Sequence, residues 1–217
     1  MTARYQIPDS DTFARTNHQT IAQRATLLQE LLPTAQTIGE LCCGDCSRQT
    51  EAYRQTGITH YVGLDISAEI VAANRAKGLD CIQGDVLDPQ VVRRFLACEV
   101  LFFGPPLSVK CDGHQGFSFA QVVPGYTDFS RLLWTDLAYQ GTAIYICPNS
   151  TTPADVRQMY DQIRLTRPDV GVRLVWQSWS TETGHGETTE PRLKYVEVWF
   201  SSVLPNRWEF RSSQDTC

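Results

Sequence analysis

Short apolar runs alternate with amphipathic segments along most of this chain. Apolar runs of strand length lie at 37–42, 61–66, 80–83, 100–103, 142–147, 172–179 and 194–203. Segments with apolar residues at helical spacing lie at 19–32, 47–56, 67–77, 88–96, 128–139 and 152–164. The pattern predicts a helix at the N-terminus, followed by strands that alternate with helices.

Strands that alternate with helices predict an α/β fold with a doubly wound, mostly parallel, seven-stranded sheet and helices on both faces. No helix separates the last two strands, so they must pair as an antiparallel hairpin at or near one edge of the sheet. The length of 217 residues suits a single domain. Within it we expect an N-terminal lead and amphipathic helix over 1–36 and the main domain over 37–217.

Composition removes several classes of protein. Hydrophobic residues make up 42% of the chain and aromatic residues 10%, which argues against disorder. The sequence has neither an apolar run near the ~18 residues of a membrane span nor an apolar stretch at its start. We therefore expect a cytoplasmic protein with no membrane partner, and the pattern leaves its oligomeric state open.

The charge balance bears on the partner. Lys and Arg number 19 against 24 Asp and Glu, a formal charge of −5. Proteins that bind long nucleic-acid duplexes usually carry a basic surface, which is not visible in the overall balance.

Eight cysteines need an explanation. They stand at positions 42, 43, 46, 81, 98, 111, 147 and 217. Without a secretory signal they are either free thiols or metal ligands. Cys42, Cys43, Cys46, Cys111 and His114 would make a zinc site, but their spacing is not that of the common structural sites. We expect no metal.

The candidate chemistry lies where the predicted strands end, because ligands of open parallel sheets bind at the carboxyl ends of the strands. The turn at 40–46 follows the first strand and is built of small residues that let a ligand approach the backbone. Asp65 ends the second strand, about 20 residues on, where an acid suits a ribose diol. Asp85 follows the third strand and can accept a hydrogen bond from an adenine amino group. Residues 104–107 follow the fourth strand and expose rigid backbone carbonyls.

These four segments together resemble the class I S-adenosylmethionine-dependent methyltransferases. ELCCGDC at 40–46 is similar to the family's E-L-G-C-G-x-G loop, and GLDISAE at 63–69 to its G-x-D-I-S-x-E segment. Gly-Asp at 84–85 matches the pair after strand three. GPPL at 104–107 resembles the [D/N]-P-P-[Y/F/W/L] motif of the branch that methylates amino groups. The motifs cover about residues 36–148, and the final hairpin fits the family's seven-stranded sheet.

The resemblance implies a methyltransferase that uses S-adenosylmethionine as cofactor. Glu40 would orient the methionine amino group or the turn, Asp65 would hold the ribose hydroxyls, and Asp85 the adenine amino group. The implied cofactor contacts are Glu40, Cys42, Gly44, Cys46, Asp65, Ile66, Asp85, Val86 and Gly104.

The implied catalytic residues are Pro105, Pro106 and His114. The Pro105 carbonyl would accept a hydrogen bond from the target amine and aim its lone pair at the methyl group. His114 lies in a long loop and could take up the released proton. Two departures from the family pattern stand out. Gly104 replaces Asp or Asn, which removes a second hydrogen-bond acceptor for the amine. Cysteines replace two of the loop glycines, at positions 42 and 46.

Three questions stay open at this point. The methyl acceptor is either a small molecule or a nucleic acid, with equal weight on each, because the Pro-Pro pair favours an amino nitrogen while the charge disfavours a large polyanion. A methyltransferase-like binding protein without activity would explain Gly104. An NAD-dependent oxidoreductase shares the strand–turn–helix pattern, although positions 42, 44 and 47 do not form its G-x-G-x-x-G fingerprint.

Overall fold

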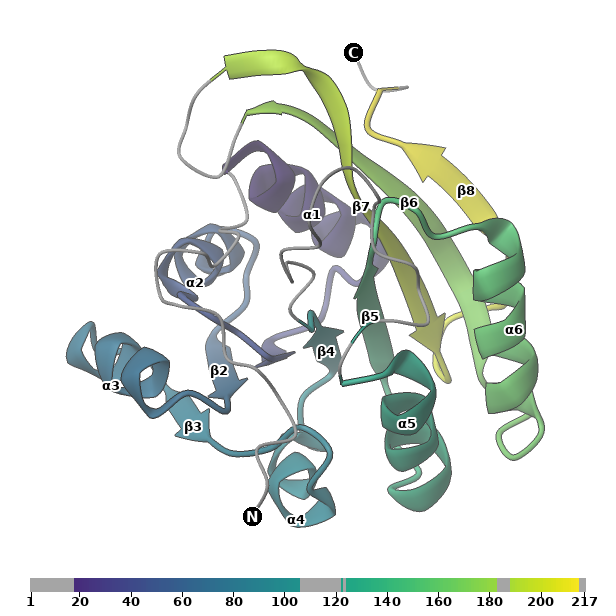
Figure 1. Ribbon diagram of the computed structural model, residues 1–217, viewed down its shortest axis with the longest axis horizontal. Coiled ribbons are helices and arrows are strands. Elements are labelled where there is room, and N and C mark those ends of the chain that lie inside the picture. The colour runs from purple at the N-terminus through teal and green to yellow at the C-terminus, as the bar shows by residue number, and fades with distance from the viewer. Residues whose placement is uncertain (1–17, 106–121, 123, 183–187, 215–217) are drawn as a thin grey trace.

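The computed structural model describes residues 18–105, 122, 124–182 and 188–214. It confirms the predicted α/β fold. One mixed sheet runs through the molecule in the order β3-β2-β1-β4-β5-β7-β6-β8, with helices on both of its faces (Figure 1).

Five neighbouring strands are parallel and the C-terminal hairpin is not. The strands are β1 Thr37–Leu41, β2 His60–Asp65, β3 Cys81–Gln83, β4 Val100–Phe103, β5 Thr142–Cys147, β6 Gly171–Glu182, β7 Thr188–Ser201 and β8 Glu209–Ser212. Strands β1 to β5 are mutually parallel, and β7 pairs antiparallel with both β5 and β6. The strand order reverses between β1 and β4, so the switch point lies at their carboxyl ends.

The sheet has one strand more than the seven that the sequence predicts. Strand β8 pairs in parallel with β6 and forms the edge. Its four residues, Glu-Phe-Arg-Ser, are half-buried or exposed, with Phe210 60% exposed. An edge strand of this kind has no apolar run, so hydrophobic patterning misses it.

In the described part of the chain, helices cover both faces of the sheet (Figure 1). They are α1 His18–Leu31, α2 Ser47–Arg54 and α3 Ala68–Ala76 on one face, and α4 Pro89–Val92, α5 Tyr126–Ser130 and α6 Pro153–Arg164 on the other. A 3₁₀ turn η2, Arg93–Phe95, extends α4, and a π-helical segment η4, Arg131–Asp136, extends α5. The hydrophobic core is accordingly split into two layers, one on each face.

Local sequence fixes several helix starts. The Ser67 hydroxyl accepts a hydrogen bond from the Ile70 amide and caps α3. Asp88 caps α4 ahead of a proline at its first position. Thr152 and Asp155 form a reciprocal capping box at the start of α6.

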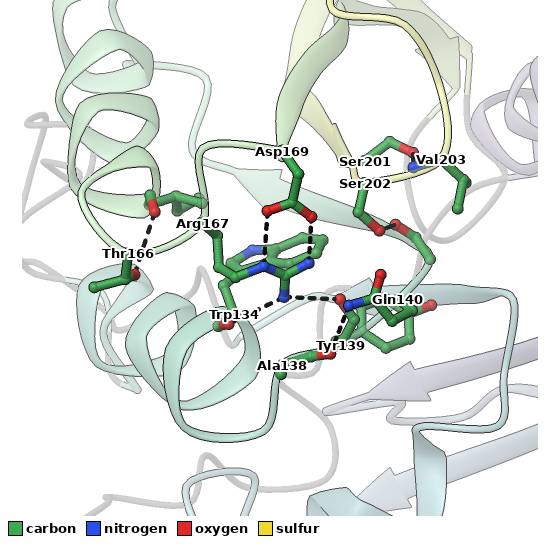
Figure 2. Close-up of polar contacts among 12 residues, drawn as sticks. Trp134, Ala138, Tyr139, Gln140, Thr166, Arg167, Asp169, Ser201, Ser202 and Val203 are labelled. Carbon is green, nitrogen blue, oxygen red and sulfur yellow. Dashed lines mark hydrogen bonds and ion pairs between the residues drawn. The ribbon is translucent and has the colours of Figure 1, made fainter.

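Arg167 joins two segments at the end of the sheet where β5 and β6 begin (Figure 2). Its guanidinium pairs with Asp169 at 2.6 Å and donates hydrogen bonds to the Trp134 and Tyr139 carbonyls, each at 3.2 Å. These bonds satisfy carbonyls that the irregular end of η4 leaves without helical partners. These contacts therefore fix the loops at this end of the sheet. The candidate site lies at the opposite end, where the parallel strands have their carboxyl ends.

Candidate functional site

The turn after β1 has an unusual backbone. Cys42 has φ of 63° and Gly44 has φ of 53°, so both residues adopt the left-handed conformation. Glycine takes this conformation without strain, whereas for other residues it costs roughly 1–2 kcal/mol. The methyltransferase loop that this turn resembles has glycine at position 42, which adopts the left-handed conformation without strain. The cysteine of this chain adopts the same conformation under strain.

Asp65 ties the end of β2 to this turn. Its Oδ2 accepts a hydrogen bond from the Gly44 amide at 3.0 Å, and its Oδ1 accepts one from the Ser67 amide at 2.9 Å. The residue is only 7% exposed. Burial raises the pKa of this carboxyl, and the hydrogen bonds from the backbone oppose the shift. A carboxylate has about four lone-pair sites, and the Ile66 amide also bonds to this one, so about one site is left for a ligand.

Asn74 of α3 holds the turn from below. Its side-chain amide donates to the Gly44 carbonyl at 2.7 Å. The same amide lies 3.9 Å from the Cys43 sulfur and 3.8 Å from the Cys81 sulfur, and these two sulfurs are 3.6 Å apart. Gly63 lies directly beneath, where a Cβ atom would come within 2.7 Å of the Cys43 sulfur. The absence of a side chain at Gly63 therefore leaves space for the Cys43 side chain of the turn.

Glu40 lies under the turn on the face covered by α1 and α2. It is 5% exposed, and the Tyr61 hydroxyl donates a hydrogen bond to its Oε2. The Gln49 side chain also bonds to it. Burial raises the pKa of Glu40, and the hydrogen bond from Tyr61 opposes that shift.

The predicted acids converge on one residue. Burial raises the pKa of Cys42 well above its usual value, and the charges of Asp65, Asp85 and Glu40 raise it further. Three carboxylates from the ends of β1, β2 and β3 therefore lie within electrostatic reach of the turn. The sequence places these acids at successive strand ends, and in the structure Asp65 contacts the turn directly through the Gly44 amide.

The end of β4 closes the other side of the switch point. The Gly104 amide donates to the Leu41 carbonyl at 3.1 Å, so residue 104 lies beside the start of the turn. A Cβ atom at Gly104 would meet Ile146 at 3.3 Å, so a larger side chain would need a small adjustment there. Pro105 is buried. Pro106 and His114, and with them the rest of the predicted substrate loop, lie outside the described residues.

Other predicted cofactor residues take different positions. Ile66 is 40% exposed beside Asp65 and offers an apolar surface. Val86 and Cys46 are buried in the two core layers, at 5% and 0% exposure, so only their backbone could meet a ligand. Asp85 is half-buried and accepts a hydrogen bond from the Leu87 amide at 2.8 Å.

Metal ligation finds no support in the described part of the chain. There, no group of three or more histidine, cysteine or acidic side chains could hold a metal ion. Cys111 and His114, which the zinc alternative also requires, lie outside the described residues.

Sequence reasoning did not single out the residues that support the site. These residues are buried polar side chains in otherwise apolar surroundings, namely Asn74, Tyr61, Arg24 and Glu197. A signal for Glu197 exists in the sequence, where a carboxylate interrupts the apolar strand Val-Glu-Val-Trp at 196–199. Identifying its partner requires the tertiary structure.

The strain at Cys42 gives a first prediction. Cys42→Gly should leave the free energy of unfolding within about 1 kcal/mol of the wild type, because relief of strain offsets the loss of a packed side chain. Cys42→Val should lower it by about 2 kcal/mol or more, because a β-branched residue tolerates positive φ poorly. Urea denaturation measures both variants. Equal stability of the two would show that the turn is not held in the left-handed conformation.

The chain was compared with protein-family models, with curated proteins and with solved structures. No model of a protein family matches the chain, and no curated protein does either. No helix in the described residues is long and apolar enough to cross a bilayer.

Solved structures do match. The methyltransferase domain of bacterial CtHen1 is 14% identical with a TM-score of 0.58, and the match covers 85% of this chain and 98% of that one. PH1948, a proposed RNA methyltransferase from Pyrococcus horikoshii, is 14% identical with a TM-score of 0.57 and 92% of both chains covered. SMU.776, a proposed methyltransferase solved with SAH, is 15% identical with a TM-score of 0.52, over 83% of this chain and 49% of that one. At such identities the likeness is one of fold.

Proposed function

We propose that this chain, which has the fold of the class I S-adenosylmethionine-dependent methyltransferases, is itself such an enzyme. It transfers a methyl group to an amino nitrogen of a small molecule or of a nucleic-acid base. The observation that carries the proposal is the convergence of Glu40, Asp65 and Asp85 on the strained turn at the switch point.

The residues present suit S-adenosylmethionine. Among the described residues, nothing lies within 4 Å of a Cβ position at Gly44, which leaves room for a ligand at this part of the turn. Asp65 keeps about one lone-pair site for a ribose hydroxyl beside its bonds to the amides of Gly44, Ser67 and Ile66. The exposed Ile66 side chain provides an apolar contact for the adenine ring, and Asp85 an acceptor for its amino group. Glu40 supplies a negative charge for the methionine ammonium.

The chemistry asked of the chain is mostly alignment. S-adenosylmethionine supplies a methyl group bound to a sulfonium sulfur. The nucleophile attacks the methyl carbon in line with the carbon–sulfur bond, and the sulfur leaves as the thioether of the demethylated product. In this proposal the Pro105 carbonyl accepts a hydrogen bond from the acceptor amine and directs its lone pair. Proximity and orientation of this kind supply a large part of the acceleration in such reactions. His114 takes up the proton that the methylated amine releases.

The acceptor stays within two classes. PH1948, which shares the fold, is a proposed RNA methyltransferase, and this is in line with a base as acceptor. The net charge of −5 is in line with a small molecule instead. Gly104 provides no side-chain acceptor for the amine, so the Pro105 carbonyl carries this contact alone.

Calorimetry tests the proposal. S-adenosylmethionine and its demethylated product should each bind the purified chain with micromolar affinity, and NADH should give no heat. Binding by NADH instead would favour the oxidoreductase. A folded protein that binds neither S-adenosylmethionine nor its product would overturn the proposal.

A second experiment separates enzyme from binding protein. The chain is incubated with methyl-labelled S-adenosylmethionine and with fractionated RNA, DNA, protein and metabolites. We expect label in the RNA, DNA or metabolite fraction. Cofactor binding without transfer to any fraction would favour the binding protein that Gly104 suggests.

A further inference from the structure

A buried ion pair lies on the same face of the sheet as Glu40. Arg24 of α1 donates two hydrogen bonds to Oε1 of Glu197 on β7, from Nε at 2.9 Å and from Nη2 at 2.6 Å. Both side chains are 0% exposed. The remaining guanidinium nitrogen, Nη1, lies 3.2 Å from the Tyr53 hydroxyl and donates to it. Helix α1 is thereby joined to β7 and to α2 through charged groups.

The register of the sheet places the Arg24 side of this pair over β4, the strand next to Glu40. The Arg24 guanidinium lies over the Phe102 ring, 5.1 Å from its centroid. Phe102 on β4 is the direct neighbour of Glu40 on β1. Side chains of directly paired residues point to the same face of a sheet, so Arg24 covers the position next to Glu40.

The buried groups do not balance in charge. Glu40 and Glu197 are two carboxylates, and Arg24 is the one cationic group that the described residues place near both. Charges interact strongly where little water is present. The charge of Arg24 lowers the pKa of Glu40, and it does so by more than the charge of Glu197 raises it; burial itself raises the pKa most. Arg24 thus favours the ionised form of Glu40.

We propose that Arg24 is a positioning residue for the cofactor: from α1, over the strand next to Glu40, its positive charge favours the carboxylate of Glu40 that would receive the ammonium group of S-adenosylmethionine. The role of Arg24 in holding the charge of Glu40 stands on the contacts above. The ligand rests on the proposed function.

Every element packed against Glu40 contributes to its charge state. Tyr61 on β2 donates a hydrogen bond to it, and Tyr53 on α2 is a buried phenol within electrostatic reach. Cys42 lies in the turn that follows the strand of Glu40. Burial raises the pKa of all three groups, and these values, like the natural pKa of arginine, lie above the range in which Glu40 titrates. Below pH 8, therefore, these three groups keep one charge state. Only Arg24 and Glu197 are changed in the variants of the test that follows.

The test measures the titration of Glu40 directly, without any ligand. Protein labelled with ¹³C at the glutamate carboxyls is titrated by NMR, and Glu40→Gln assigns the signal. Arg24→Met should move the midpoint upward by about 1 pH unit or more, because an attractive charge is lost and a repulsive one stays. Glu197→Gln should move it downward. The double variant Arg24→Met/Glu197→Gln should fall between the wild type and Arg24→Met.

This order distinguishes an electrostatic role from a structural one. Looser packing would move the midpoint in the same direction in every variant, whereas the proposal requires opposite signs for the two single changes. If Arg24→Met does not fold, Glu197→Gln and the double variant still bracket the wild type. Arg24→Lys, which keeps the charge, should stay near the wild type. An unchanged midpoint in the double variant, or an upward shift in Glu197→Gln, overturns the proposal.

Cofactor affinity gives the second readout. Affinity for S-adenosylmethionine is lost as the pH falls through the pKa of Glu40, so in the double variant this loss should begin at a higher pH than in the wild type. An Asp65 titration contributes equally to both proteins and cancels in the comparison. Failure of the wild type to bind would count against the proposed function alone, since the NMR titration judges Arg24 independently.

Discussion

Replacing Asp65 with asparagine should reduce the affinity for S-adenosylmethionine and for its demethylated product by about 100-fold or more. A hydrogen bond to a charged group contributes about 1.5–3 kcal/mol, and a ribose hydroxyl would lose such a bond to this carboxylate. Both carboxylate oxygens also accept backbone amides, from Gly44 and Ser67. An asparagine offers one acceptor oxygen and turns a donor toward the other amide, so the turn itself should open. Isothermal titration calorimetry measures the loss.

Asp88→Asn is the matched control. Asp88 also follows a strand and accepts a backbone amide, from Gln90 at 2.8 Å, but it is exposed and caps α4 on the other face of the sheet. Asparagine caps helices as well as aspartate does, so this variant should bind like the wild type. Equal affinity of Asp65→Asn and Asp88→Asn would remove Asp65 from the site.

Removing Glu197 should destabilise the protein more than any other change considered. Glu197→Leu leaves the fully buried Arg24 without its counter-charge, and breaking a buried pair in this way costs about 3–5 kcal/mol. The other oxygen of Glu197 has no hydrogen-bond partner within residues 18–105, 122, 124–182 and 188–214, so Arg24 is the main compensation for its burial. The free energy of unfolding from urea denaturation checks the effect.

Two further variants separate the charge from the packing. Arg24→Met/Glu197→Leu should recover much of the loss, because apolar side chains of similar volume often replace a buried ion pair without cost. Asp161→Asn removes the exposed pair with Arg157, in which both side chains are 62% exposed, and should change stability by less than about 1 kcal/mol. A double variant as unstable as Glu197→Leu would show that packing, rather than the unpaired charge, causes the loss.

Strand ends were the most predictable part of the candidate site. Asp65 and Asp85 could be placed at one edge from the sequence, because the carboxyl ends of parallel strands meet there whatever the side chains between them. The strain at position 42 was not predicted: the sequence shows only that cysteine replaces a glycine of the resembling loop, and the positive φ comes from the structure. The predicted substrate residues Pro106 and His114 remain predictions.

Buried polar partners were the least predictable part. Arg24 and Glu197 lie 173 positions apart, and Asn74 reaches Gly44 across 30. Each of these residues occupies an inward position in an amphipathic helix or an apolar strand, where hydrophobic patterning expects an apolar side chain. The hydrophobic pattern shows that a polar residue stands at an inward position, but it does not show which distant residue pairs with it.

The sequence by itself determined the alternation of strands and helices, the parallel sheet, the antiparallel hairpin and the acids at three strand ends, because these follow from local periodicity and chain connectivity. Only the tertiary structure decided the added strand β8, the left-handed Cys42 and the ion pair that joins α1 to β7 beside Glu40. The physical reason is range. Periodicity acts over a few residues, whereas edge pairing, backbone strain in a packed turn and buried charge compensation arise only when distant segments meet.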